Sequence, residues 1–368
     1  MKRIRSRFCN TDIEYVAEQE NQLFKGISTL MVAANVPFDR FYVEVDNVQV
    51  WTGSSIPKEE IPTIDYDKKP PILLIHGICS NLGVWVRNIT SLQSHGNPVF
   101  AIDLPGFGLS TRIDFPDDHN ESEQLFCKYI HLWLIKMQLR KVVFVGHSFG
   151  GYLSCSFACN YPWQVVNIVL IDPWGIIETK NYLVDRISSE GLSALKNLLL
   201  TRFAIKGRIA KLISPFLLTD LVRVLGKIYG LSVVRTVEDK ICQGFVKDLG
   251  DSGPEIWASF IYAINSLHPR YSLAHFSGEL AFRSMIDPFF NAKNPIMERL
   301  ERLSFLKKLY YICGEESPLD YKAGHWVKNQ LDQTELFVIP NADHKLHINS
   351  YMEANEILIE IIKDINET

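Results

Sequence analysis

The sequence predicts an α/β fold in which helices cover both faces of a mostly parallel β-sheet. Short apolar runs alternate along the chain with helical patterns, as expected for parallel strands that are buried on both faces. One such run, Lys141 to Val145, leads directly into Gly146-His147-Ser148-Phe149-Gly150-Gly151, a pattern that predicts a strand, a tight turn and a helix. The chain has 368 residues, of which 47% are hydrophobic, so it can form a large core and carry one sizeable insertion.

Each predicted strand is an apolar run that ends at turn-forming residues. In chain order these runs begin at Pro71, Val99, Lys141, Val166, Leu309 and Leu336. The first run enters the turn at His76-Gly77, and the second leaves through Asp103-Leu104-Pro105-Gly106-Phe107-Gly108. A helical insertion is expected after the fourth run, because apolar residues recur with helical spacing from Leu195 to Phe216.

Ser148 lies at the apex of the predicted turn and is the expected nucleophile. A serine at this position adopts a strained backbone conformation, and glycine neighbours are needed because a Cβ would collide with the helix or the strand. The helix N-terminus directs free amides and the positive end of its dipole towards the hydroxyl. We therefore expect the backbone N–H groups of Ile78 and Phe149 to bind the oxyanion, the first from the loop after His76-Gly77 and the second from the helix start.

The general base is expected after the final strand, where His344 lies. His347 is the alternative, but the turn directly after the strand is where a histidine can reach the serine. The acid that orients the imidazole is expected at Asp320, which follows the next-to-last predicted strand. Asp172, at the end of the strand before that one, is the competing candidate, although an Asp-Pro pair after a strand is a common turn initiator.

Several longer motifs accompany the Ser148 turn. The most specific are Asp172-Pro173-Trp174-Gly175 and Ser277-Gly278-Glu279-Leu280-Ala281-Phe282. The others are Glu18-Gln19-Glu20-Asn21, His76-Gly77, the segment Asp103 to Ser110, Pro295-Ile296-Met297-Glu298-Arg299 and the segment around His344. On these motifs the chain resembles the α/β-hydrolase-domain subfamily of the N-acylphosphatidylethanolamine lipase and its paralogue, the adipose triglyceride lipase coactivator. The resemblance implies an α/β-hydrolase fold with a helical cap after the sixth strand, and its acid position also falls on Asp320.

The resemblance implies an enzyme that cleaves lipid acyl esters or amides. By this resemblance, the lipase branch has a serine at the turn and the vertebrate coactivators have an asparagine there. This chain has Ser148. By the same resemblance, the coactivator branch has an arginine and a glycine at the two positions where this chain has Glu316 and Asp343. We therefore expect a serine hydrolase of lysophospholipids or N-acylphospholipids that acts in lipid homeostasis and requires no metal or cofactor.

Two other functions stay open on the same resemblance. One is a lipid-droplet-associated coactivator that binds a triglyceride lipase, although the tryptophan-rich N-terminal anchor of that branch is missing before Trp51. The other is an acyltransferase that acts on lysophosphatidic acid, in which an alcohol must outcompete water for the acyl-enzyme. The subfamily's His-x-x-x-x-Asp signature ends here at Asn349, which weakens the acyltransferase prediction.

The predicted domains and surface charge suggest where the protein acts. We expect an N-terminal helical segment at 1–40, a core formed by 41–175 and 296–368, and a helical cap at 176–295. The net charge is −4, yet eight basic residues accompany one acidic residue between Gly191 and Arg235. Basic residues interleaved with large apolar ones are typical of helices that bind a phospholipid or lipid-droplet surface, and a packed cap with a solvated basic face is the alternative. Nucleic acid is not an expected partner.

The cysteine content and the absence of a signal core predict a cytoplasmic protein, peripheral on membranes or lipid droplets. The seven cysteines have no disulfide-framework spacing. The basic segment Met1 to Arg7 is not followed by a hydrophobic signal core, and no apolar run is long enough to span a bilayer.

Overall fold

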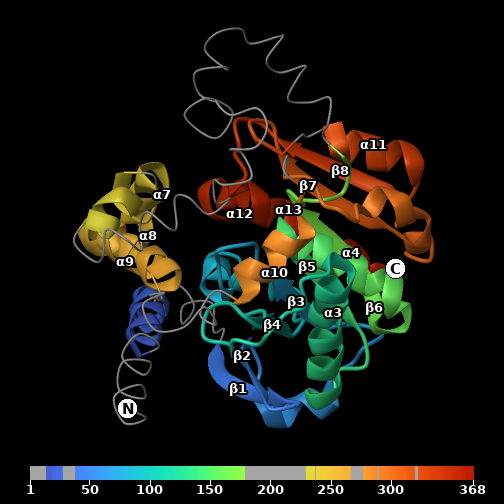
Figure 1. Ribbon diagram of the computed structural model, residues 1–368, viewed down its shortest axis with the longest axis horizontal. Helices are drawn as coiled ribbons and strands as arrows, with labels where there is room; N and C mark the ends of the chain where they lie inside the picture. Colours follow the sequence, from blue (N-terminus) through green and yellow to red (C-terminus); the bar gives the residue numbers. More distant parts are fainter. Residues whose placement is uncertain are drawn as a thin grey trace, which may run out of the picture.

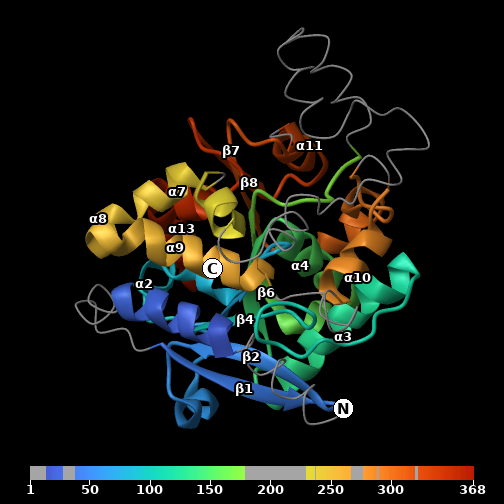
Figure 2. The same ribbon diagram turned by 60° about the vertical axis from the view of Figure 1, so that its left-hand side comes forward.

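A computed structural model, shown in Figure 1, arranges the chain around one central β-sheet. The structure describes residues 14–27, 38–178, 229–236, 238–266, 277–287, 290–319 and 322–368. Helices lie on both sides of the sheet, and the view turned by 60° in Figure 2 separates the two helical layers.

Eight strands form the sheet in the order β1-β2-β4-β3-β5-β6-β7-β8. Their bounds are β1 (Asp39–Val45), β2 (Val48–Ser54), β3 (Ile72–Ile75), β4 (Val99–Ile102), β5 (Val142–His147), β6 (Val165–Ile171), β7 (Leu309–Gly314) and β8 (Thr334–Ile339). All neighbours from β4 to β8 in this order pair in parallel, whereas β2 pairs antiparallel with both β1 and β4. The predicted, mostly parallel sheet is therefore confirmed, and β3 to β8 lie where the apolar runs predicted strands.

The antiparallel hairpin of β1 and β2 lies outside the strands predicted above. Asp46 and Asn47 join its strands and have φ angles of 47° and 61°. Two consecutive positive φ angles define the tight turn that best suits the twist of a hairpin, and aspartate and asparagine tolerate them. An Asp-Asn pair between two alternating strands is thus the local signal that could have predicted this element.

Both faces of the parallel strands are buried. Leu73 and Ile75 pack in one hydrophobic cluster with Phe126, whereas Ile72 and Leu74 pack in a second cluster with Leu358. Successive side chains of a strand point to opposite faces, so a continuous apolar run requires helices on each side. The predicted double coverage of the sheet is therefore observed.

The helices that supply this cover differ in length and kind. The α-helices are α2 (Ile89–Leu92), α3 (His119–Lys136), α4 (Phe149–Asn160), α7 (Asp239–Gly244), α8 (Val246–Leu249), α9 (Gly253–Ser266), α10 (Ser277–Met285), α11 (Lys322–Gln330), α12 (Leu346–Asn349) and α13 (Tyr351–Glu367). Residues 14–27 and 229–236 are also helical. The 3₁₀ helices are η1 (Lys58–Thr63), η2 (Leu82–Trp85), η3 (Pro162–Gln164), η5 (Gly250–Ser252) and η8 (Ile296–Leu303). Among the helices that the structure describes, none has the length and apolar character needed to cross a bilayer.

The helices between β6 and β7 are attached to the core through Arg87. Its Nε donates to Asp248 of α8 at 2.6 Å, and its terminal nitrogens donate to the carbonyls of Gly244 at 2.7 Å and Ile348 at 2.9 Å. The guanidinium also lies over the ring of Phe245, 3.6 Å from its centre. Both charged side chains are buried, so removal of either would leave an uncompensated charge.

Part of the cap expected at 176–295, residues 179–228, lies outside the described residues.

A buried carboxylate attaches the N-terminal helix to the sheet. Glu20, from the helical residues 14–27, is fully buried. It accepts hydrogen bonds from Arg40 of β1 at 3.0 Å, Trp51 of β2 at 2.9 Å and Asn81 at 2.9 Å. Burial raises the pKa of Glu20, and these three donors oppose that shift. The helix therefore contacts the loop after β3 as well as the sheet edge.

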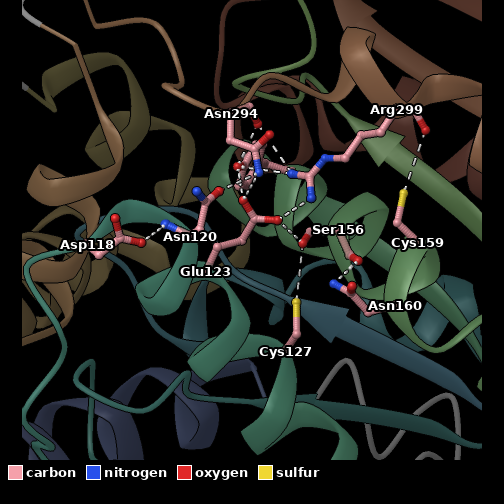
Figure 3. A network of polar contacts seen from close by, with 10 residues as sticks. Asp118, Asn120, Glu123, Cys127, Ser156, Cys159, Asn160, Asn294 and Arg299 are labelled. Carbon is pink, nitrogen blue, oxygen red and sulfur yellow. Dashed lines mark hydrogen bonds and ion pairs between the residues drawn. The ribbon is translucent and has the colours of Figure 1, made fainter.

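A second buried network, drawn in Figure 3, holds α4 against its neighbours. Glu123 of α3 pairs with Arg299 of η8 at 2.5 Å. The same carboxylate accepts hydrogen bonds from Tyr152 at 2.5 Å, from Asn294 at 3.0 Å and from Ser156. Because the donors come from α4 and from the segment before η8, one side chain of α3 joins three elements. The helix that follows Ser148 is thus fixed at a point away from the serine.

Candidate active site

Ser148 occupies a sharp turn between β5 and α4. Its φ of 53° and ψ of −116° lie outside the regions that side chains normally adopt, as the sequence pattern predicted. A Cβ on Gly146 would lie 2.5 Å from the carbonyl oxygen of Gly150, and one on Gly77 would lie 2.9 Å from Nδ1 of His147. Glycine is therefore required both inside the turn and in the loop that faces it.

A continuous chain of hydrogen bonds runs from Ser148 to a buried carboxylate. The Ser148 Oγ lies 3.0 Å from Nε2 of His344, in the loop after β8. Nδ1 of the same ring lies 2.5 Å from Oδ2 of Asp172, whose side chain is 2% exposed. An aspartate that accepts from Nδ1–H leaves Nε2 free to take the serine proton. Ser148 and His344 thus lie together as the sequence predicted, and the rival His347 does not contact Ser148.

Asp172 contacts Nδ1 of His344, where the sequence analysis expected Asp320. Asp320 itself lies outside the described residues. Asp172 directly follows β6, has a φ of 42°, and donates its backbone N–H to Ile312 of β7 at 2.7 Å. The described structure thus places Asp172 at Nδ1 of His344, and the role expected for Asp320 stays a prediction from sequence.

Ser317 is a further polar neighbour that sequence reasoning did not single out. Its buried Oγ donates to Oδ2 of Asp172 at 2.5 Å, the same oxygen that accepts from His344. Ser317 lies in the turn after β7 and donates its backbone N–H to Gly314 at 3.2 Å. No motif marks this serine, because its partner becomes evident only when the ends of β6 and β7 are placed side by side.

The loop after β3 is held beside Ser148 by two buried side chains. His76 accepts a hydrogen bond from the Leu104 N–H at 3.0 Å, and burial lowers its pKa to about 4, so it remains neutral. Asp103 accepts from the N–H of Leu82 at 2.7 Å and of Leu109 at 2.7 Å. Both contacts fix the segment that contains Ile78 relative to the exit of β4.

The two residues predicted to bind the oxyanion both lie near the serine, one beside it in the chain and the other in the lining of the same cavity. Ile78 lines the same cavity as Ser148, and the next residue, Cys79, has a φ of 55°. Phe149 is the first residue of α4, so its N–H belongs to the group of amides that a helix cannot bond internally. An anion near Ser148 would also lie at the positive end of the α4 dipole.

Two buried histidines surround His344 and remain neutral. The Nε2 of His147 lies 2.9 Å from the carbonyl oxygen of His344, and the two rings lie 4.7 Å apart. Burial lowers the pKa of His147 well below 6.5, and the neighbouring His347 and His344 lower it further. Burial likewise lowers the pKa of His347 to about 3. Neither neighbour therefore adds positive charge beside His344 near neutral pH.

A cavity of about 280 Å³ opens at Ser148 and His344. One wall comes from the loop after β3 and the other from the helices between β6 and β7. Its apolar lining includes Ile78, Val84, Val233, Val234, Trp257, Ile261 and Ile348. Polar lining residues include Glu238 and Lys345. A mostly apolar cavity with a few polar groups suits a ligand that has both an acyl chain and a polar part.

Comparison with known proteins agrees with the fold. Residues 70–202 match a family described as alpha/beta hydrolase fold. The abhydrolase domain-containing protein abhd-5.2 of Caenorhabditis elegans is 28% identical over 97% of this chain and 71% of its own length. The human (lyso)-N-acylphosphatidylethanolamine lipase is 26% identical over 88% of this chain and 86% of its length. The human 1-acylglycerol-3-phosphate O-acyltransferase ABHD5 is 27% identical over 81% of this chain and 79% of its length.

A solved structure extends the agreement to the fold. The 2-hydroxy-6-oxo-6-phenylhexa-2,4-dienoate hydrolase from Rhodococcus superimposes with a TM-score of 0.60 over 88% of this chain and 98% of that chain, at 15% identity. At this identity the likeness is one of fold alone. The chain therefore has the α/β-hydrolase fold and is similar in sequence to the (lyso)-N-acylphosphatidylethanolamine lipase and the ABHD5 proteins.

Proposed function

We propose that the protein is a serine acyl hydrolase in which Ser148, His344 and Asp172 form the catalytic triad. The observation that carries this proposal is the pair of contacts on one imidazole, 3.0 Å from Nε2 to the Ser148 hydroxyl and 2.5 Å from Nδ1 to Asp172. The strained backbone of Ser148 at the start of α4 supports the same assignment, since a structural serine has no need of it.

The first half of the proposed reaction forms an acyl-enzyme. Nε2 of His344 accepts the hydroxyl proton of Ser148 while Oγ attacks the acyl carbonyl carbon. The carbonyl oxygen becomes an oxyanion, which the N–H groups of Ile78 and Phe149 bind. The tetrahedral intermediate then expels the alcohol or amine, and the imidazolium returns its proton to that leaving group. Asp172 stabilises the imidazolium throughout.

The second half releases the fatty acid. His344 takes a proton from a water molecule, whose oxygen attacks the acyl carbonyl carbon on Ser148. Collapse of this second tetrahedral intermediate breaks the bond to Oγ, which regains the proton from His344. Water is consumed and one carboxylic acid is produced, so the balance needs no metal, oxidant or reductant.

Lipid acyl esters or amides are the proposed substrates. Two relatives carry names of lipid acyl chemistry, one a lipase of N-acylphosphatidylethanolamine and the other an acyltransferase of 1-acylglycerol 3-phosphate. The mostly apolar cavity at Ser148 supports an acyl-chain ligand. We therefore propose lysophospholipids and N-acylphospholipids as the first classes to assay, presented on a membrane or lipid-droplet surface with which the protein associates peripherally.

Covalent labelling by a fluorophosphonate tests the proposed nucleophile. The probe reacts with an activated serine, so wild type should be labelled and should release fatty acid from a lysophospholipid, whereas Ser148→Ala should do neither. Ser154→Ala is the matched control, because Ser154 is a buried serine of the same helix whose Oγ contacts the Gly150 carbonyl. Labelling that persists in Ser148→Ala, or a wild type inert beside an active control hydrolase, would refute the proposal.

The name of the ABHD5 relative favours acyl transfer as a second candidate reaction. It would share the acyl-enzyme on Ser148, with the hydroxyl of lysophosphatidic acid in place of water. Incubation with an acyl donor and lysophosphatidic acid distinguishes the two, since transfer yields phosphatidic acid and hydrolysis yields free fatty acid. If Ser148→Ala and wild type stimulate a triglyceride lipase equally and neither forms a product, the coactivator alternative holds instead.

A further inference from the structure

Three polar residues of the proposed site come from the ends of three neighbouring strands. Asp172 follows β6, Ser317 lies in the turn after β7 and His344 lies in the loop after β8, and these strands are adjacent in the order β6-β7-β8. Neighbouring strands lie about 4.8 Å apart, so Asp172 and His344 start from strands roughly 10 Å apart. Their hydrogen bond therefore bridges the end of β7, where the turn that contains Ser317 begins.

The turn after β7 is bonded to the loop that carries His344. The backbone N–H of Glu316 donates to the carbonyl of Ala342 at 2.9 Å. A Cβ on Gly314 would lie 2.3 Å from the same carbonyl oxygen, so the two backbones are in direct contact. These contacts hold the turn at a fixed distance from the His344 loop.

The hydroxyl of Ser317 bonds the same turn to Asp172. Its buried Oγ lies 2.5 Å from Oδ2 of Asp172 and accepts the N–H of Leu319 at 3.0 Å. A hydroxyl has one proton and a backbone N–H only donates, so the Ser317 proton points at the carboxylate. Oδ2 thus accepts two hydrogen bonds, one from Ser317 and one from Nδ1–H of His344. Donors to a buried carboxylate stabilise its charged form.

We infer that Ser317 is a positioning residue of the proposed reaction, whose hydroxyl holds Oδ2 of Asp172 at Nδ1 of His344 and keeps the carboxylate charged. This inference rests on the proposed function. Ser317 acts through Asp172 and not on the substrate, since it is not among the residues that line the cavity at Ser148. Because its hydroxyl shares the negative charge of the carboxylate, it also weakens the attraction between Asp172 and the imidazolium. Loss of the hydroxyl should therefore slow turnover and favour protonation of His344 at higher pH.

Other titratable groups also surround the ring and its carboxylate. Within the described part of the chain they are His147 of β5, Cys313 of β7, Asp343 and Lys345 beside His344, His347 of α12, and Glu238, which pairs with Lys345. Burial lowers the pKa of the two neighbouring histidines, so they stay neutral, and it raises the pKa of the Cys313 thiol to about 12. None of these groups is altered by a substitution of Ser317, so a changed pH profile reports on His344 and Asp172.

The pH profile of ester hydrolysis tests the inference. In Ser317→Ala, kcat for a short-chain ester should fall about tenfold while KM stays within about twofold, because a hydrogen bond to a charged group is lost away from the substrate. The acid limb of kcat/KM should move to higher pH by about half a unit. Ser317→Thr keeps the hydroxyl and should return kcat to within about threefold of wild type and the acid limb to its place. In Asp172→Asn, adding Ser317→Ala should lower kcat/KM less than about twofold, because the hydroxyl acts through the carboxylate.

Ser156→Ala is the matched control. Ser156 is also a buried serine that donates to a buried carboxylate, that of Glu123, but it lies about two turns beyond Ser148 along α4 (Figure 3). This variant should keep the acid limb of wild type. The inference is overturned if Ser317→Ala keeps the wild-type kcat, lowers kcat without moving the acid limb, or loses as much activity in Asp172→Asn as in wild type.

Two further measurements keep the result decisive. Circular dichroism checks folding, and Ser317→Cys, which keeps the size of the side chain but donates weakly, takes the place of Ser317→Ala if that variant unfolds, with the same expected shift. Fluorophosphonate labelling of Ser148 and the activity of Asp172→Asn are measured separately. An unlabelled wild type or a fully active Asp172→Asn would overturn the proposed triad, whereas an inactive Asp172→Asn beside an unaffected Ser317→Ala would overturn this inference alone.

Discussion

Two of the three residues proposed for the triad have a backbone conformation that side chains rarely adopt. Ser148 and Asp172 have φ angles of 53° and 42°, a strain of roughly 1–3 kcal/mol each. Each of them donates its backbone N–H to a neighbouring strand, Ser148 to the carbonyl of Ile171 at 3.0 Å and Asp172 to that of Ile312 at 2.7 Å. These bonds join the ends of neighbouring strands, so the sheet itself sets the positions of both side chains.

Asp172→Asn should lower kcat by about 10³- to 10⁴-fold while the protein stays folded, because the amide favours the wrong imidazole tautomer and cannot stabilise the imidazolium. Hydrolysis of a short-chain ester, with circular dichroism as a check of folding, measures the effect. Asp320→Asn is the comparison and should stay within about threefold of wild type. A folded pair of variants with the opposite order of activities would return the acid to the loop after β7.

The buried His347 predicts a pH dependence of stability. Burial lowers its pKa from 6.5 to about 3, so the unfolded chain binds a proton that the folded chain excludes between these values. Its contribution is fully present above pH 6.5 and is lost as the pH falls towards 3, at up to about 1.4 kcal/mol per pH unit. His347→Phe should therefore reduce the loss of unfolding free energy between pH 7 and 5 by about 2 kcal/mol in urea titrations.

His119→Phe provides the matched control for this measurement. Its side chain is 30% exposed, at the start of α3. The slope of stability against pH should match wild type in this variant. An unchanged slope in His347→Phe as well would contradict the burial argument.

At the scale of elements, the Ser148 turn requires α4 to approach β3 backbone to backbone. A Cβ on Gly150 would lie 2.2 Å from the carbonyl oxygen of Ile75 and 2.7 Å from that of His76. Neither β3 nor α4 can move apart to make room for the added methyl group. Ile75 of β3 pairs with both neighbouring strands, and the Glu123 network holds α4 in place. The position of the nucleophile thus depends on contacts along the whole length of α4.

Gly150→Ala should destabilise the protein by about 2 kcal/mol or more, since the added methyl forces backbone atoms apart. Urea unfolding measures this loss, and fluorophosphonate labelling of Ser148 should slow in the same variant. Gly244→Ala is the control, because the nearest atom to its Cβ would be Arg87 Nη1 at 3.7 Å, an ordinary contact. Equal stability of the two variants would show that α4 can shift without cost.

At the scale of the whole molecule, charge is distributed unevenly along the chain. The net charge is −4, whereas the segment Gly191 to Arg235 is strongly basic. Most of this segment lies outside the described residues, so its role remains a prediction from sequence. The described cavity wall includes Val233 and Val234, at the C-terminal end of the same segment. A lipid surface bound by the basic residues would thus be connected along the chain to the cavity.

The protein should bind vesicles that contain anionic phospholipid more strongly than neutral vesicles, and added salt should weaken this preference because exposed charges are screened. Cosedimentation at low and high salt measures the effect. Replacing Arg202, Lys206 and Lys211 together by glutamine should reduce anionic binding, whereas Lys58→Gln, in η1, should not. Equal binding to both vesicle types would leave the basic residues as the solvated face of a packed cap.

Local patterns were sufficient for a large part of this structure. Each apolar run from Pro71 to Leu336 overlaps one strand of the parallel sheet, because strands covered on both faces must be continuously apolar. The turn at Ser148 was predictable because its glycines and its strand–helix context are contiguous in sequence. The contact of His344 with Ser148 followed from its place after the last strand, since the loops at the carboxyl edge of a parallel sheet converge.

By itself, the sequence determined the sheet, the position of the serine and the histidine that meets it, all of which depend on contiguous residues. Only the tertiary structure showed that Asp172 lies at Nδ1 of His344, because Asp172 and Asp320 both follow predicted strands and local patterns cannot show which carboxylate reaches that ring. It also brought Glu238 beside Lys345, more than a hundred residues away in the chain. Contacts of this kind, between residues far apart in the sequence, depend on how the loops and helices pack against the sheet. The spacing of residues along the chain does not determine them.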